Sequence, residues 1–120
     1  MYAFDYQRPA DRAGAKSAYQ GDARYLAGGQ SLIQAMKLRL SASERLVDLG
    51  GIADLKGIKV DGGSVVIGAM TTHAAVAASA DVRKAIPALA DLAGGIGDQM
   101  VRNMGTIGGS IANADPAACY

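Results

Sequence analysis

Short apolar segments alternate with polar turns through the first half of the chain, and their spacing predicts a β-α-β arrangement. Aromatic residues at every second position favour a strand over residues 2–6. An Ala-rich segment predicts a helix over residues 10–20, and a short strand follows at residues 23–27. Leu32, Met36 and Leu40 recur every fourth position and predict a helix over residues 31–40. Residues 46–49 predict another short strand.

The second half begins with a predicted hairpin. Residues 58–60 and 65–67 flank a turn of Asp, two Gly and Ser. Thr71 and Thr72 are suitable N-caps for a helix over residues 73–80, and residues 81–86 predict one further turn. Pro87 suits the first position of a helix that ends at Gly94-Gly95. Residues 105–115 consist mostly of Gly, Asn, Asp, Ser and small apolar residues and predict a loop.

Composition narrows the class of protein. The 120 residues are 50% apolar with a net charge of +1, so a disordered tail and a strongly basic nucleic-acid binder are excluded. No apolar run reaches the roughly 18 residues of a membrane span, and the first residues lack a signal-peptide pattern. We therefore expect a cytoplasmic protein. A single Cys and a single His exclude an internal disulfide and a Cys- or His-rich metal site within these residues.

The segment Ala27-Gly28-Gly29-Gln30-Ser31 is the clearest candidate binding loop. A strand leads into two glycines, and Ser31 opens a helix. Glycines let backbone N–H groups approach an anion closely, and the start of a helix adds unpaired N–H donors. The pattern is typical of phosphate binding. The alternative is a plain strand–turn–helix junction in which Ser31 serves only as the cap.

A second Gly-rich segment, Thr106-Ile107-Gly108-Gly109-Ser110, again places glycines beside hydroxyl groups. Two such loops in one short chain suggest a single extended, phosphate-bearing ligand that touches both, although the second loop could instead be a tight connection in a sheet. The chain contains neither G-x-G-x-x-G nor G-K-[ST], which excludes the Rossmann fingerprint and the Walker A loop. His73 and Cys119 lack the neighbours typical of catalytic residues.

Several segments together resemble one family, in the order in which they occur along the chain. They are Met1 to Pro9, Ala27-Gly-Gly-Gln-Ser-Leu-Ile33, Leu46-Val-Asp-Leu49, Ile67-Gly-Ala-Met-Thr-Thr-His73 and Gly105-Thr-Ile-Gly-Gly-Ser-Ile-Ala-Asn-Ala-Asp-Pro116. This chain is similar to the FAD-binding medium subunits of molybdenum hydroxylases, the family that includes carbon monoxide dehydrogenase and xanthine dehydrogenase.

The resemblance implies an α/β (α+β) fold of the PCMH type, also called vanillyl-alcohol-oxidase-like, in which two subdomains hold an extended FAD between them. Residues 1–51 would form a complete first subdomain with a small parallel sheet. Residues 52–120 would begin a second subdomain with a larger, antiparallel sheet, and that subdomain would be truncated. The residues that the resemblance assigns to the cofactor are Ala27, Gly28, Gly29, Gln30, Ser31, Thr106, Ile107, Gly108, Gly109, Ser110, Asn113 and Asp115.

The resemblance also implies partners and a reaction. A large subunit would oxidise substrate at a molybdenum–pterin centre, and a small subunit would carry two [2Fe-2S] clusters. Non-covalently bound FAD would pass electrons to an acceptor, so no catalytic side chain or metal ligand is expected in this chain. Cys119 stands where family members usually carry Asp. Two alternatives stay open: an orphan fragment that only contacts partner subunits, and a module that binds another nucleotide phosphate.

Overall fold

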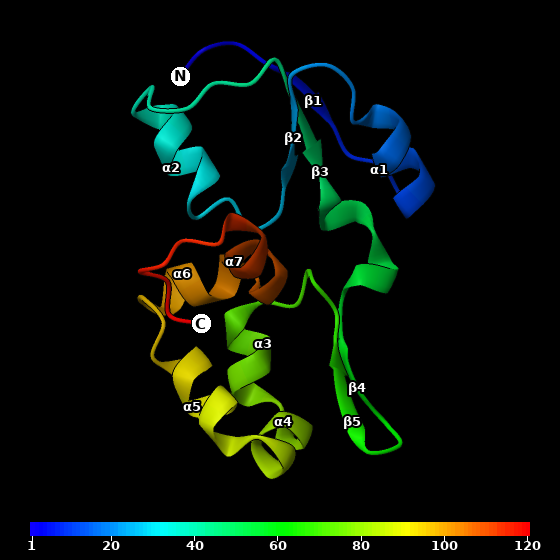
Figure 1. The fold of residues 1–120 in the computed structure, drawn as a ribbon, viewed down its shortest axis with the longest axis vertical. Coiled ribbons are helices and arrows are strands. Elements are labelled where there is room, and N and C mark those ends of the chain that lie inside the picture. Colours follow the sequence, from blue (N-terminus) through cyan, green and yellow to red (C-terminus); the bar gives the residue numbers. More distant parts are fainter.

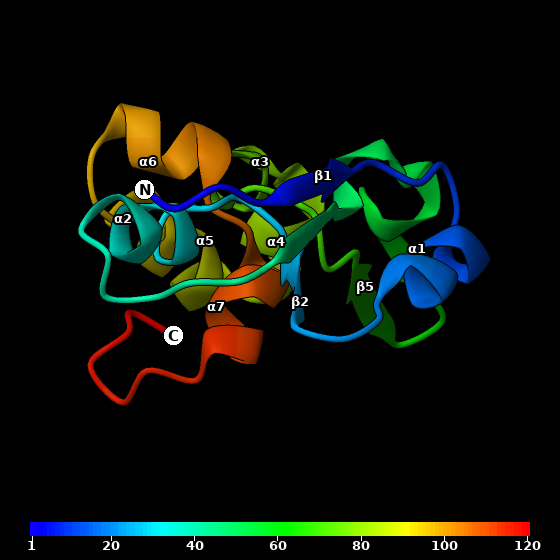
Figure 2. The same cartoon turned by 90° about the horizontal axis from the view of Figure 1, so that it is seen from above.

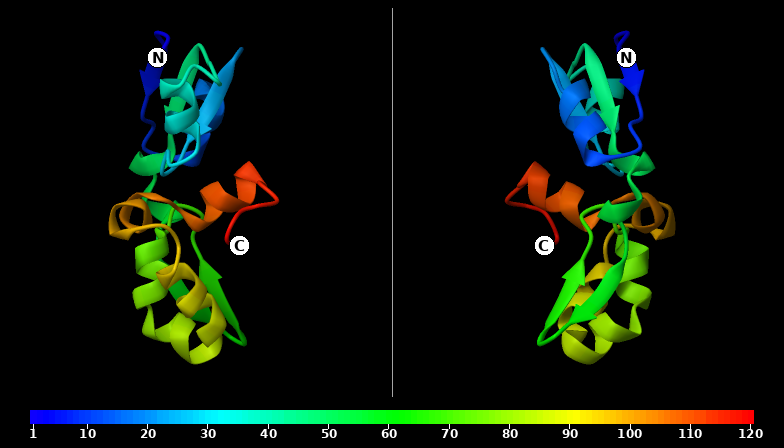
Figure 3. Two further views of the ribbon diagram at one scale, coloured as in Figure 1. Left: turned by 90° about the vertical axis from the view of Figure 1, so that its left-hand side faces the viewer. Right: turned by 90° about the vertical axis from the view of Figure 1, so that its right-hand side faces the viewer.

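The chain forms two small sheets that lie apart along the long axis of the molecule, with helices packed around each. The structure is a computed structural model that describes all of residues 1–120 and measures 44 × 30 × 22 Å. The N-terminal sheet occupies one end, and a hairpin with three helices occupies the other (Figure 1). The C-terminal segment lies beside the middle of the molecule, between the two ends (Figure 3).

The first sheet has three parallel strands: β1 (Asp5–Gln7), β2 (Ala23–Leu26) and β3 (Arg45–Asp48), in the order β1-β3-β2. Parallel neighbours need crossover connections. Helix α1 (Arg12–Ala18) supplies the first of these, and α2 (Leu32–Lys37) supplies the second. The predicted β-α-β arrangement is therefore confirmed. Seen from above, α1 and α2 lie at opposite sides of the sheet (Figure 2).

Four of the five predicted elements of this half are longer than the observed ones, and the fifth, β3, has the predicted length. The strand predicted over residues 2–6 begins only at Asp5, because only Asp5–Gln7 pairs with β3. The helix predicted to reach residue 40 ends at Lys37, since Arg39 adopts a left-handed conformation (φ 56°). Leu40 consequently leaves the apolar face of the helix and is 79% exposed. The prediction that Leu40 lies on one helix face with Leu32 and Met36 was wrong, because the helix ends before it.

The second half contains the predicted hairpin, formed by β4 (Ile58–Asp61) and β5 (Ser64–Ile67) in antiparallel register. Two single turns of 3-10 helix, η1 (Leu49–Gly51) and η2 (Ala53–Leu55), connect it to β3. In these residues the second sheet consists of this hairpin alone. Helices α3 (His73–Ala78), α4 (Ala80–Ala85) and α5 (Pro87–Gly94) follow.

The loop predicted over residues 105–115 is instead largely a helix, α7 (Ile107–Asn113), and it follows a further unpredicted helix, α6 (Gln99–Met104). Glycine disfavours helix by about 1 kcal/mol, which explains the incorrect loop prediction. Three hydrogen bonds support the start of this helix. Thr106 caps α7 by accepting a hydrogen bond from the Gly109 amide at 3.0 Å. The amides of Ile107 and Gly108 donate to the carbonyls of Thr71 and Ala69.

Each half has its own buried apolar cluster. Ala15, Val47 and Ile52 are buried together in the first half. Val76, Val82, Ala90 and Ala93 form the cluster of the second half, against which the hairpin packs. An isolated antiparallel bridge between Thr72 and Thr106 joins the start of α3 to the start of α7. No helix in the structure has the length and apolar character needed to cross a membrane.

Candidate functional site

The two Gly-rich segments line one pocket of about 460 Å³. This volume lies within the ~300–1,000 Å³ of typical small-molecule sites. The wall contributed by the first half comes from the end of β2 and the loop before α2. The other wall comes from the segment before α3 and from α7. The lining residues outside the two loops include Tyr19, Arg24, Tyr25, Leu49, Ala69, Met70, His73 and Asn113.

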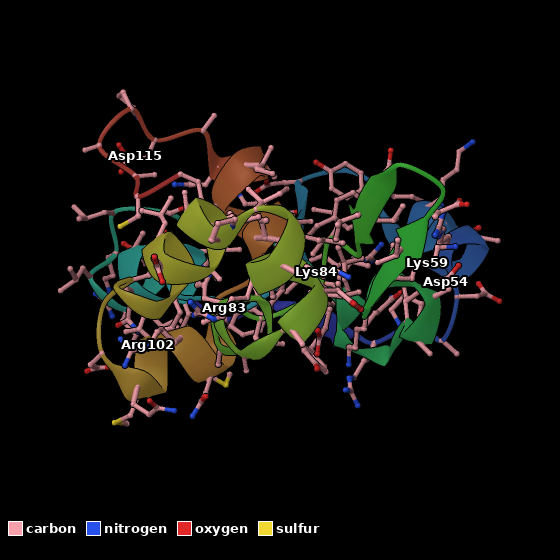
Figure 4. All side chains as sticks on the ribbon, turned by 90° about the horizontal axis from the view of Figure 1, so that it is seen from below. Asp54, Lys59, Arg83, Lys84, Arg102 and Asp115 are labelled. Carbon is pink, nitrogen blue, oxygen red and sulfur yellow. The ribbon has the colours of Figure 1, made fainter.

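Most of the residues predicted from sequence line this pocket. They are Ala27, Gly28, Gly29, Gln30, Ser31, Thr106, Gly108, Gly109, Ser110 and Asn113. Ile107 and Asp115 do not line it. The Asp115 carboxylate instead accepts a hydrogen bond from the Ala117 amide at 2.9 Å. Asp115 lies on the exposed turn that follows α7 (Figure 4).

Gly28 brings the two loops into direct contact. A Cβ atom placed on Gly28 would lie 2.1 Å from the carbonyl oxygen of Met104 and 2.7 Å from the Cα of Gly105. Gly108 also packs tightly against another segment. A Cβ atom on Gly108 would lie 2.5 Å from the carbonyl oxygen of Ala69. Close contact between protein segments therefore requires glycine at these two positions, whether or not a ligand also approaches the backbone.

The first loop presents unpaired backbone donors. The amide groups of Gly29, Gln30 and Ser31 donate to no acceptor in the protein. Gly29 has a φ of 74°, a conformation that favours glycine and turns the chain into α2. Ser31 occupies the N-cap position of α2, but its hydroxyl makes no capping hydrogen bond. The interpretation of Ser31 as only a cap was therefore wrong, and its hydroxyl is free to meet a ligand.

The second Gly-rich segment forms the N-cap and first turns of α7, and it differs from the first loop in its unpaired groups. The amides of Gly108, Gly109 and Ser110 all donate within the protein, to Ala69 O, Thr106 Oγ1 and Thr106 O. The side chains of Ser110 and Asn113 have no hydrogen-bond partner in the protein and line the pocket. One wall therefore offers mainly backbone N–H groups, while the other wall offers a hydroxyl and an amide.

The pocket carries positive charge without any acidic side chain. Arg24 on β2 is the one lining residue with a full charge, it is exposed, and it forms no ion pair. Arg24 was missed from the sequence because a lone Arg on a short strand has no motif around it. The nearby rings of Tyr19 and Tyr25 stack with centroids 4.4 Å apart and also line the pocket.

His73 is the other lining residue that sequence reasoning set aside. It is 4% exposed and begins α3, where its amide donates to the Gly105 carbonyl at 3.0 Å. Its Nδ1 lies 2.7 Å from the hydroxyl of Tyr120. Burial lowers the pKa of the His73 imidazole and raises the pKa of the Tyr120 phenol to about 12.

The whole chain matches a known family. The family model described as the FAD binding domain in molybdopterin dehydrogenase matches residues 2–119. The chain belongs to this family of FAD-binding domains. The resemblance inferred from the sequence, the PCMH-type fold and FAD as the family's cofactor are thereby confirmed.

Individual relatives agree. The carbon monoxide dehydrogenase medium chain of Afipia carboxidovorans is 48% identical over 116 residues, which cover 94% of this chain and 40% of that one. The glyceraldehyde dehydrogenase medium chain of Sulfolobus acidocaldarius is 38% identical over 117 residues. The crystal structure of quinoline 2-oxidoreductase from Pseudomonas putida 86 superposes with a TM-score of 0.93 at 39% identity, and the match covers 98% of this chain and 42% of that one. The chain thus spans about 40% of the length of these relatives.

The residues present fit FAD in three respects. Unpaired amides of the first loop and hydroxyl groups from both loops supply donors for phosphate and ribityl oxygens. Arg24 supplies a positive charge for an anionic dinucleotide. Apolar and aromatic side chains supply surface for a ring system. When bound, FAD would supply the redox chemistry, and the protein would supply position and electrostatics.

Proposed function

We propose that this protein binds FAD non-covalently in the pocket between its two Gly-rich loops. The observation that carries the proposal is that the two segments, separated by more than 70 residues in sequence, line the same pocket. The residues that we assign to the cofactor are those predicted from sequence, with Arg24 added. Ile107 and Asp115 would contribute through the conformation of α7 and its following turn.

We further propose that the chain divides close to Gly51 into two FAD-binding subdomains, 1–51 and 52–120. The separate apolar clusters of the two halves support this division. Ile52 belongs to the first cluster and Leu55 packs against it, so the segment after Gly51 would be the connection that holds the subdomains together.

The enzymatic role that the family supports best is that of an electron-transferring component of a molybdenum-containing oxidoreductase. We propose that the protein works beside a molybdopterin-binding large subunit and a small subunit with [2Fe-2S] clusters. It would hold FAD where electrons from those clusters reach it on their way to an acceptor. Two relatives of the chain, the carbon monoxide dehydrogenase and glyceraldehyde dehydrogenase medium chains, support this assignment. Substrate choice would belong to the large subunit.

The test is cofactor binding by the full-length protein. Purified protein should carry a flavin absorption spectrum, and protein stripped of cofactor should recover it when FAD is added. ADP should compete with FAD, because it shares the pyrophosphate, but it should bind more weakly. Protein that takes up no FAD after reconstitution would refute the proposal, and equal affinity for ADP and FAD would indicate a general nucleotide-phosphate module instead.

A further inference from the structure

His73 has one ring nitrogen occupied by the protein and one that is not. Nδ1 lies 2.7 Å from the Tyr120 hydroxyl, whereas Nε2 has no hydrogen-bond partner in the protein. Tyr120 itself is held in place by packing against the apolar cluster around Val76 and Ala90. The rings of His73 and Tyr120 lie 5.2 Å apart at an angle of 47°. The contact at Nδ1 therefore holds the imidazole in place, while Nε2 has no hydrogen-bond partner in the protein.

The contact with Tyr120 is compatible with either ring tautomer of His73, since a phenol hydroxyl both donates and accepts. The Tyr120 hydroxyl makes no other hydrogen bond in the protein, and in one of the two arrangements it donates to Nδ1. Burial keeps the phenol protonated, with a pKa of about 12, and lowers the pKa of the imidazole, so that the ring is neutral near pH 7. A neutral ring that accepts at Nδ1 must carry its hydrogen on Nε2. Nε2 is then a hydrogen-bond donor.

His73 lines the pocket, and its Nε2 is accessible. Arg45 Nε is the one enclosed side-chain polar atom that lacks a partner, so Nε2, which also lacks one, is not enclosed. His73 is 4% exposed, and the space that it borders is the pocket. A Cβ on Gly105 would lie 2.9 Å from Nε2 and would crowd it, so the glycine keeps the atom accessible.

We propose that His73 donates a hydrogen bond from Nε2 to an acceptor atom of the bound FAD, with Tyr120 as the residue that positions the imidazole by donating to Nδ1. The inference rests on the proposed function, since it assigns a further binding residue to the same site. Nε2 is open to solvent in the cofactor-free protein, and an acceptor on FAD would replace water as its partner when FAD binds. Phosphate, ribityl and isoalloxazine groups all offer acceptor atoms.

Two substitutions of His73 distinguish the contribution of Nε2 to FAD binding from that of Nδ1. In the full-length protein, His73→Gln places an amide N–H near the position of Nε2, whereas His73→Asn places one near Nδ1 and leaves nothing at Nε2. We expect His73→Asn to weaken FAD binding about tenfold and His73→Gln to bind nearly as wild type, as measured by quenching of flavin fluorescence. Equal affinities of wild type and His73→Asn would overturn the proposal.

A spectroscopic measurement keeps the proposal falsifiable if a variant does not fold. In cofactor-free, ¹⁵N-histidine-labelled protein, the His73 signals should show the tautomer protonated at Nε2. Addition of FAD should shift the Nε2 signal more than that of Nδ1, and Tyr120→Phe should bring in the other tautomer. A His73 ring protonated at Nδ1, or an Nε2 signal unmoved by FAD, would overturn the assignment. If wild-type protein takes up no FAD at all, the proposed function itself fails, which is a different result.

Discussion

At the scale of single residues, the charge of the pocket depends on Arg24. No acidic side chain lines the pocket, so this guanidinium acts on a bound anion without a competing carboxylate. Arg24 is exposed, and solvent therefore screens part of its effect. Tyr19 and Tyr25, which also line the pocket, stack on each other.

We expect Arg24→Gln to weaken FAD binding by about tenfold, because a charge-assisted hydrogen bond contributes roughly 1.5–3 kcal/mol before screening. The loss should shrink as salt concentration rises. Titration of cofactor-free protein with FAD at two salt concentrations measures both effects. Lys59→Gln is the matched control, because Lys59 lies on β4, outside the pocket, and has no ion pair (Figure 4). The same affinity for both variants would contradict the role of Arg24.

The phenol of Tyr120 predicts a dependence of stability on alkaline pH. Burial raises its pKa from 10.0 to about 12, so the folded protein holds this proton where the unfolded chain releases it. Its contribution to the free energy of unfolding is full below pH 10 and is lost as pH rises toward 12. Urea unfolding between these pH values should show a fall in stability that Tyr120→Phe reduces. An identical pH profile for the variant would show that Tyr120 is not buried against His73.

At the scale of elements, helix capping determines where the short helices begin. Asp11, Thr72, Ser79, Asp98 and Thr106 each accept a hydrogen bond from an amide three residues later in the chain. None of these helices is longer than eight residues, and short helices form only with support from caps and packing. The caps are therefore as important to the pocket as the loops themselves, since α7 forms part of its wall.

Thr106→Val should destabilise cofactor-free protein by about 1 kcal/mol, because it removes the hydroxyl cap of α7 while retaining the branched shape. Thermal or urea unfolding of the full-length protein measures the change. Thr106→Ser is the control, since it retains the hydroxyl and should recover most of the loss. If both variants lose the same stability, the methyl group and its packing would be the important feature of Thr106.

Elements that depend on local sequence patterns could be predicted, whereas those that depend on contacts with distant residues could not. The parallel strands, the hairpin and the Thr72 cap follow from local patterns and are present. Helix α7 could not be predicted, because it depends on amides that donate to Thr71 and Ala69, far away in sequence. The loops of the candidate site were visible as motifs. His73 and Arg24 were not, because only the fold places them at the pocket.

At the scale of the whole molecule, the two halves meet where Gly28 touches Met104 and Gly105. Each half has a small buried cluster, and the pocket lies along the seam between them. A ligand that contacts both walls would therefore stabilise the arrangement of the halves as well as the loops. The free energy of unfolding would rise with the ratio of ligand concentration to Kd. The increase is about 2.7 kcal/mol when the ligand concentration is a hundred times Kd.

Saturating FAD should consequently slow amide hydrogen exchange in both halves of the full-length protein, at β2 and the first loop as well as at α3 and α7. A ligand held by one wall alone would protect one half, and that result would contradict a binding site shared between the loops. Gly28→Ala is expected to reduce the protection on both sides, because its Cβ would lie 2.1 Å from the Met104 carbonyl and would force the walls apart. Gly63→Ala is the matched control, since a Cβ there meets nothing within 4 Å and its φ is not in the left-handed region. Protection that survives Gly28→Ala unchanged would show that the two walls move independently and that the close contact between the loops does not determine the width of the site.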